Sequence, residues 1–453
     1  MTMTSRNHLK LSLLSMLAIG PGLLLNSALG PIQHLIQKEF GIENTMTFSP
    51  TIMGMVTLAL FIPCGPILKH RIGIRTSYLI SMVVFVFGSL LAALSMDMYW
   101  MTISRFLQGM ATGVMLMIMI PTLVLSFPID KRNLALAVLL LGFFGSTVLG
   151  MFLGNVAMIY SHWRWIFYVA GTLACIGAIL CRFFLKIETS HLKNEQPSQP
   201  SSLILNFCLL IVDSIKEVKR PLLELKWIKH PKPLLGMSMA VTSNIILMLS
   251  LFAIQGMLKE IHHVLPEQTL FIYVCMFVGV VISSILCTIL YDILGPGLLG
   301  FLGSITILTV IVQWMFIAQG MPSSFILILM NITLLTSGVG ITIGSGLMGA
   351  ALGGPLPDLV KRMTVVQFFR FMLNTLSTIV IGWYTTQFSV TGLSKDPSME
   401  SSLTYHNILI AALIVNIILS CLSFGLHLTG KGHKLAHKPH LNHETANKNA
   451  ARS

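Results

Sequence analysis

Two arginines lie inside long apolar stretches of this sequence, at positions where a charge is costly. Arg105 and Arg370 each follow the start of an apolar block by about six residues, or roughly 9 Å along a helix. A guanidinium at that depth in a membrane is expensive unless water or a polar partner faces it. In one interpretation both side chains line or order a pathway through the membrane. In the other they extend toward the nearer interface.

Groups for bond-breaking chemistry are missing from the apolar blocks. All sixteen acidic residues fall at block ends, in connections or in the tail. We find no paired carboxylates, metal-spaced histidines or activated nucleophile within reach of the blocks, which argues against an enzyme. The seven cysteines show no metal or redox spacing. A Gly-x-x-x-x-Gly-Lys-Ser/Thr loop is also absent, so ATP-driven pumping is not expected. The sequence predicts no catalytic residue, metal site or cofactor.

The elements that must position the two arginines are membrane helices. The 453 residues are 54% hydrophobic and 10% charged, whereas soluble domains average about a quarter charged residues. The apolar residues come in blocks of about twenty, which matches the thickness of a bilayer crossed by a helix. The formal charge of +13 does not predict nucleic-acid binding, because the basic residues lie in short turns and in the tail. The composition predicts an all-α, polytopic membrane protein.

Twelve blocks can be distinguished, and each predicts one transmembrane helix. They group as an N-terminal six-helix bundle at 1–185 and a C-terminal bundle at 234–428. A charged, Ser- and Pro-rich linker, 186–233, joins the bundles, and a basic tail, 429–453, is expected to be disordered. Within the linker, Leu203–Ile215 is too short to span and is predicted to lie along the membrane surface. The blocks are Leu11–Gly30, Thr51–Leu68, Ser77–Ser95, Met98–Phe127, Leu134–Ile159, Trp165–Leu185, Leu234–Gly256, Thr269–Leu290, Leu298–Ile317, Ser323–Gly346, Thr364–Gln387 and Asn407–His427.

The distribution of lysine and arginine predicts the orientation. With the N-terminus inside, the cytoplasmic segments hold 22 of the 29 basic residues and the outer loops hold four. Both termini and the linker are therefore predicted to be cytoplasmic. Short loops and basic cytoplasmic turns suit a bacterial inner membrane.

Local motifs give the chain a resemblance to the major facilitator superfamily. Residues 105–109 match its Arg-x-x-Gln-Gly signature, and Trp163–Phe167 resembles an outer-face motif of its drug exporters. Residues 26–32, 338–340 and the set Gln367, Arg370 and Gly382 are similar to other segments of the drug:proton antiporter branch. The resemblance implies two related six-helix bundles around a central cavity. It also implies that this cavity is lined by Asn26, Arg105, Gln108, Arg370 and Asn374.

The superfamily's gating loop, which closes the cytoplasmic side through charge pairs, is altered here. His70 stands at its acidic position, while Arg71, Gly73 and Arg75 fit the pattern. Asp292 and Gly295 keep the acid and glycine in the same register of the second half, as expected for an internal repeat. Two further departures concern exporters: Gly150–Asn155 lacks the proline of their Gly-Pro-x-x-Gly-Gly motif, and Pro21 stands where antiporters carry an acid.

These features predict a secondary active transporter that moves a small, lipophilic molecule by alternating access, with export as the leading hypothesis. Uptake of a nutrient or metal chelate is the first alternative. A transport-inactive receptor or scaffold on the same fold is the second. Its partners are expected to be the small-molecule substrate and membrane lipid, with no nucleic acid, and the chain is expected to act as a monomer.

Overall fold

The computed structural model describes residues 5–41, 50–128, 132–184, 230–260, 264–319, 324–354, 358–391 and 397–429. Every regular element within these ranges is a helix. The predicted linker lies outside the described residues except for its last few positions, and so does the predicted surface helix Leu203–Ile215. The tail beyond residue 429 lies outside them as well.

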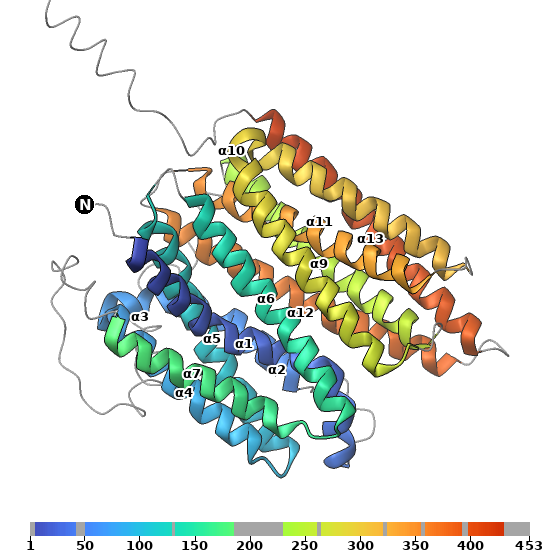
Figure 1. Ribbon diagram of the computed structural model, residues 1–453, viewed down its shortest axis with the longest axis horizontal. Helices are drawn as coiled ribbons and strands as arrows, with labels where there is room; N and C mark the ends of the chain where they lie inside the picture. Colours follow the sequence, from blue (N-terminus) through green and yellow to red (C-terminus); the bar gives the residue numbers. More distant parts are fainter. Residues whose placement is uncertain are drawn as a thin grey trace, which may run out of the picture.

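The described helices form two groups that lie side by side (Figure 1). The first group comprises α1 (Ser5–Glu39), α2 (Pro50–Phe61), α3 (Cys64–Ile72), α4 (Ile74–Ala93), α5 (Met98–Ser126), α6 (Arg132–Ile159) and α7 (Arg164–Phe184). The second comprises α9 (Pro231–Glu260), α10 (Pro266–Ala318), α11 (Phe325–Leu352), α12 (Leu359–Thr391) and α13 (Pro397–Leu428).

These helices amount to twelve membrane spans. Ten helices are long and apolar enough to cross a bilayer one by one. The pair α2 and α3, bent by 56°, adds an eleventh span. α10 counts once among the ten, but its 53 residues would extend about 80 Å at 1.5 Å per residue, which is long enough for two crossings. Its backbone breaks at Gly295, so it contains two spans, and the predicted number of twelve is confirmed.

Each bundle repeats the same helix pairing. α1 packs against α5, α6 and α7, and its counterpart α9 packs against α11, α12 and α13. The two bundles meet mainly where α6 contacts α10 and where α2 contacts α12. The predicted architecture of two six-helix bundles is therefore confirmed, with four helices at the junction where a pathway would run.

The altered glycine motif of α6 serves helix packing. A Cβ at Gly150 would lie 2.2 Å from the carbonyl oxygen of Leu24, and one at Gly154 would lie 2.4 Å from that of Ala28. Both carbonyls belong to α1, so α1 and α6 touch backbone to backbone, as small residues permit in lipid.

Several helices extend beyond the predicted blocks. α1 continues through Pro31 to Glu39, although a proline usually ends a helix. In a membrane bundle, neighbouring helices compensate for the lost hydrogen bond, and the helix persists. α12 begins at Leu359 rather than at Thr364. Arg370 consequently lies eleven residues beyond the helix start, or about 16 Å along its axis, so the expected depth of about 9 Å is corrected.

Candidate functional site

The Arg105 side chain lies at the centre of the first bundle. It is 1% exposed, and one terminal nitrogen, Nη1, donates to Oε1 of Gln108 at 2.6 Å. The other terminal nitrogen, Nη2, donates to Oδ1 of Asn26 on α1. The guanidinium is thus buried and held by two neutral amides, which rules out extension toward the interface.

Two residues that sequence reasoning missed complete this cluster. The Gln108 amide, through Nε2, donates to Oγ of Ser89 on α4 at 3.2 Å. Gly54 on α2 packs so closely that a Cβ there would lie 2.6 Å from Nη2 of Arg105. Four spans therefore meet at this cluster. Neither residue belongs to a motif, so only the fold could identify them.

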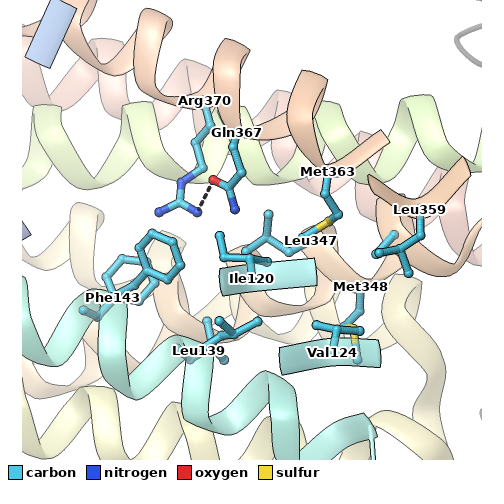
Figure 2. A pocket seen from close by; sticks show the side chains of 13 residues that line it. Ile120, Val124, Leu139, Phe143, Leu347, Met348, Leu359, Met363, Gln367 and Arg370 are labelled. Carbon is cyan, nitrogen blue, oxygen red and sulfur yellow. Dashed lines mark hydrogen bonds between the residues drawn. The ribbon is translucent and has the colours of Figure 1, made fainter. Parts of the chain in front are cut away.

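Arg370 lies apart from that cluster, at the junction of the two bundles. Its side chain is 4% exposed and projects from α12 toward α6 (Figure 2). Nη1 donates to Oε1 of Gln367 at 3.2 Å. The guanidinium carbon lies 5.0 Å from the ring centre of Phe143 and 5.9 Å from that of Phe144, both on α6. On its own helix, the ring of Phe371 lies 5.2 Å away.

A pocket opens beside Arg370 and Gln367. Its apolar walls come from α5 and α6 of the first bundle and from α11 and α12 of the second, with Ile120, Leu139 and Met363 among the side chains that face it (Figure 2). The space of about 440 Å³ around the pocket includes the gaps between its lining atoms and the open solvent at its mouth. We call this pocket the Arg370 pocket. Arg370 and Gln367 supply its only polar side chains.

The five predicted cavity residues therefore do not form one site: three make a cluster, Arg370 lines a separate pocket, and Asn374 belongs to neither. Asn26, Arg105 and Gln108 come together inside the first bundle, and none of them lines the Arg370 pocket. Asn374, one turn beyond Arg370, is 6% exposed and is not among the pocket-lining side chains either. Phe143, Phe144 and Gln367 were not predicted as site residues. The Phe-Phe pair was the available signal, although such pairs usually serve packing.

The predicted gating-loop residues occupy matching places in the two bundles. His70 and Arg71 lie in the last turn of α3, and Arg75 in the first turn of α4. Gly73 between these helices has φ 78° and ψ 162°, and Gly295 has φ 74° and ψ 168°, three residues after Asp292. This backbone conformation is essentially restricted to glycine. The repeat that the sequence suggested is thus present in the backbone geometry.

At the opposite end of the molecule, a hydrogen bond joins the two bundles. The side-chain amide of Asn155 on α6, through Nδ2, donates to the carbonyl oxygen of Pro266 at 2.6 Å. Asn155 is 2% exposed and Pro266 is the first residue of α10. At this end Glu39 also accepts from Trp163 Nε1 and from Arg164 Nη1, both at 2.5 Å, within the first bundle.

Metal-binding clusters are not evident in the described part of the chain. No group of three His, Cys, Asp or Glu side chains there could hold an ion. The buried polar side chains of the described residues are hydroxyls, amides and guanidiniums, which are suited to hydrogen bonding and, for the guanidiniums, to charge recognition.

Comparisons with known proteins agree with this architecture. The family model described as "Major Facilitator Superfamily" matches residues 15–382. The chain is 40% identical to "Uncharacterized MFS-type transporter YubD" of Bacillus subtilis (strain 168), over 98% of this chain and 93% of that protein. It is 31% identical to "Putative multidrug resistance protein MdtD" of Yersinia pseudotuberculosis, over 30% of each chain.

A solved structure has the same fold. It is that of the MFS proton:xylose symporter XylE bound to 6-bromo-6-deoxy-D-glucose. The superposition has a TM-score of 0.62, covers 91% of this chain and 95% of that one, and pairs residues that are 12% identical. At this identity the likeness concerns the fold alone. Together with the family match over most of its length, these findings show that the chain is a transporter of the major facilitator superfamily.

Proposed function

We propose that the protein is a secondary active transporter that exports a small, lipophilic molecule by alternating access. The observation that carries this proposal is the Arg370 pocket, which lies between the two bundles and is lined by both. A ligand held there contacts both bundles at once, so its binding depends on their relative position. That dependence is what alternating access requires.

The direction of transport is inferred from which end of the junction is closed. The Arg370 pocket lies near the ends of α5 and α11 and the start of α12, beside Arg132, Lys361 and Arg362. The charge bias predicts that this basic end is cytoplasmic. The Asn155–Pro266 bond joins the two bundles at the opposite end, which we take as the closed end. A pocket on the cytoplasmic side of a closed junction is suited to loading for export, and the partial likeness to MdtD supports the same direction.

We further propose a monomer in a bacterial inner membrane, with both termini and the linker in the cytoplasm. The domain limits at 185, 233 and 428 are part of this proposal. Cysteines placed at Ser198 and at Met96 test the topology in a background without native thiols. Outside labelling of intact cells should reach the second position and not the first. Labelling at Ser198 would overturn the topology.

A flux experiment tests the function itself. Everted and right-side-out vesicles from cells lacking other pumps are compared, with and without the protein, against a panel of lipophilic compounds. Protein-dependent accumulation in everted vesicles is expected, because their cytoplasmic face is outside. Accumulation only in right-side-out vesicles would indicate an importer. Binding without flux would favour a receptor, for which His70 at the gating position is the specific observation.

A further inference from the structure

The charge of Arg370 is not neutralised by any described residue. Its side chain is almost fully buried, yet it donates a single hydrogen bond, at 3.2 Å, to the neutral amide of Gln367. Nε is buried without a hydrogen-bond partner. Nη2 donates to no described residue, so most of the planar donor fork is unused. A buried cation in this condition is unfavourable unless an acceptor is supplied from elsewhere.

Two other buried arginines, Arg105 and Arg362, each have two hydrogen-bond acceptors, although their Nε atoms, like that of Arg370, are buried without a partner. Arg105 has two amide oxygens, from Asn26 and Gln108. Arg362, on the same helix as Arg370, donates to the carbonyl oxygens of Ala351 at 2.7 Å and Gly354 at 3.0 Å. Of these three, Arg370 alone faces an open pocket.

The aromatic rings around Arg370 do not replace an anion. Phe143, Phe144 and Phe371 attract a cation through the quadrupoles of their rings, but they carry no net charge and accept no strong hydrogen bond. Bidentate acceptors such as carboxylates and phosphates bind a guanidinium in its plane, and the ring contacts do not supply such an acceptor.

The pocket offers donors and almost no acceptor. Besides the unused nitrogens of Arg370, the amide nitrogen Nε2 of Gln367 is buried without a partner. The Oε1 atom of Gln367 already accepts from Arg370. An acceptor-only group such as a carboxylate or sulfonate fits this set, whereas an ammonium would meet a like charge and no free acceptor. The remaining walls are apolar and suit a hydrocarbon or aromatic body.

We propose that the Arg370 pocket binds a lipophilic anion, whose acidic head group is held by Arg370 and Gln367 and whose apolar body lies against the walls from both bundles. That this anion is a transport substrate rests on the proposed function, whereas its binding to the pocket does not. It names a substrate class that the family relationship leaves open.

Three probes of the same aromatic body test the head-group preference: naphthalene-2-sulfonate, naphthalene-2-sulfonamide and the cation (2-naphthylmethyl)trimethylammonium. Binding to purified full-length protein in detergent is measured by equilibrium dialysis and by ligand-induced thermal stabilisation. We expect the sulfonate to bind at least about tenfold more tightly than the sulfonamide, and the cation most weakly. Equal binding of the three probes, or no binding of the sulfonate, would overturn the proposal.

Variants assign the preference to Arg370. In Arg370→Gln the sulfonate should lose its advantage of about tenfold, while the sulfonamide binds as before. Lys361→Gln is the matched control, because it removes one positive charge from the same helix at a half-exposed position outside the pocket, and it should keep the wild-type preference. A preserved preference in Arg370→Gln would overturn the assignment. If that variant does not fold, Gln367→Leu should weaken binding of the sulfonate and leave binding of the other two probes unchanged. The comparison of the three probes on the wild-type protein then tests the anion preference.

Flux separates this inference from the proposed function. Proteoliposomes are loaded with each probe, and protein-dependent release is followed. If the sulfonate binds in an Arg370-dependent way but is not released, the proposed binding site is supported and the proposed transport is rejected. Release of the sulfonamide and the cation as readily as the sulfonate would keep transport and reject the anion preference.

Discussion

Replacing Asn155 with alanine should open the end of the molecule that its hydrogen bond closes. The bond from Nδ2 to the Pro266 carbonyl is partly buried and joins α6 of one bundle to the start of α10 in the other. A neutral hydrogen bond contributes about 1 kcal/mol net. Its loss only in the closed state should raise the ratio of open to closed molecules about fivefold. Asn155→Gly, the residue that the motif of related exporters has there, should act in the same direction.

Distance measurements between spin labels can detect this shift. Labels at Met96 and Ile326, which are 88% and 70% exposed at the same end of the two bundles, report their separation. Asn416→Ala is the matched control, since Asn416 donates to the Ser304 carbonyl at 3.1 Å within the second bundle. It should lower stability without moving the distance distribution. An unchanged distribution in Asn155→Ala, or an equal shift in Asn416→Ala, would refute this reasoning.

Four further substitutions have clear expectations. Gly150→Ala should sharply reduce the monodisperse fraction in size-exclusion chromatography, because its Cβ would lie 2.2 Å from the backbone oxygen of Leu24. Gly142→Ala is the control and should leave that fraction unchanged, because its Cβ would lie 3.5 Å from Cγ of Met16. Gly73→Ala and Gly295→Ala should each cost about 1–3 kcal/mol and lower the unfolding temperature. Gly30→Ala, which meets no atom within 4 Å, is their control. Arg105→Lys should abolish flux at normal membrane abundance, since an ammonium cannot hold both amides in the planar geometry of the fork; wild-type flux would contradict the role given to it.

The parts of the fold that the sequence predicts well are those set by local physics. Block length alone locates the spans, because a bilayer fixes the length of each apolar helix. The family resemblance implied that Asn26, Arg105 and Gln108 line one cavity with Arg370 and Asn374, and the structure brings the first three together. Their role in transport stays a prediction. The repeated glycine was also visible, since its register recurs with His70 in one half and Asp292 in the other.

What the sequence could not predict depends on packing between bundles. Nothing in the Phe143-Phe144 pair indicates that it will face Arg370 from more than two hundred residues away. The depth of Arg370 was underestimated because α12 includes the polar turn before its apolar block. Likewise, Asn155 lies in a helix-packing motif. Its side-chain amide has an acceptor, the Pro266 carbonyl, only because α6 packs against the start of α10. These features arise from tertiary contact and carry no local pattern.

The positions of the carboxylates bear on energy coupling in this protein. Each described carboxylate lies in the first or last turn of a helix, directly before a helix, or beside the break at Gly295. Pro21 stands at the position where the antiporter motif has its acid.

A proton gradient should therefore drive transport only weakly when the substrate itself does not titrate. The test is flux of a permanently charged or neutral compound in proteoliposomes, with and without a one-unit pH gradient and with the membrane potential clamped. Accumulation driven by the gradient alone would refute the reasoning. The candidates would then be His34, His70 and His406. His34 and His406 lie well inside α1 and α13 rather than at the ends where the shorter predicted blocks placed them, because both helices extend past those blocks. Histidine is the side chain that ordinarily titrates near neutral pH. His34→Gln and His406→Gln would then identify the proton-carrying residue, because the relevant variant would lose the effect of the pH gradient and keep downhill flux.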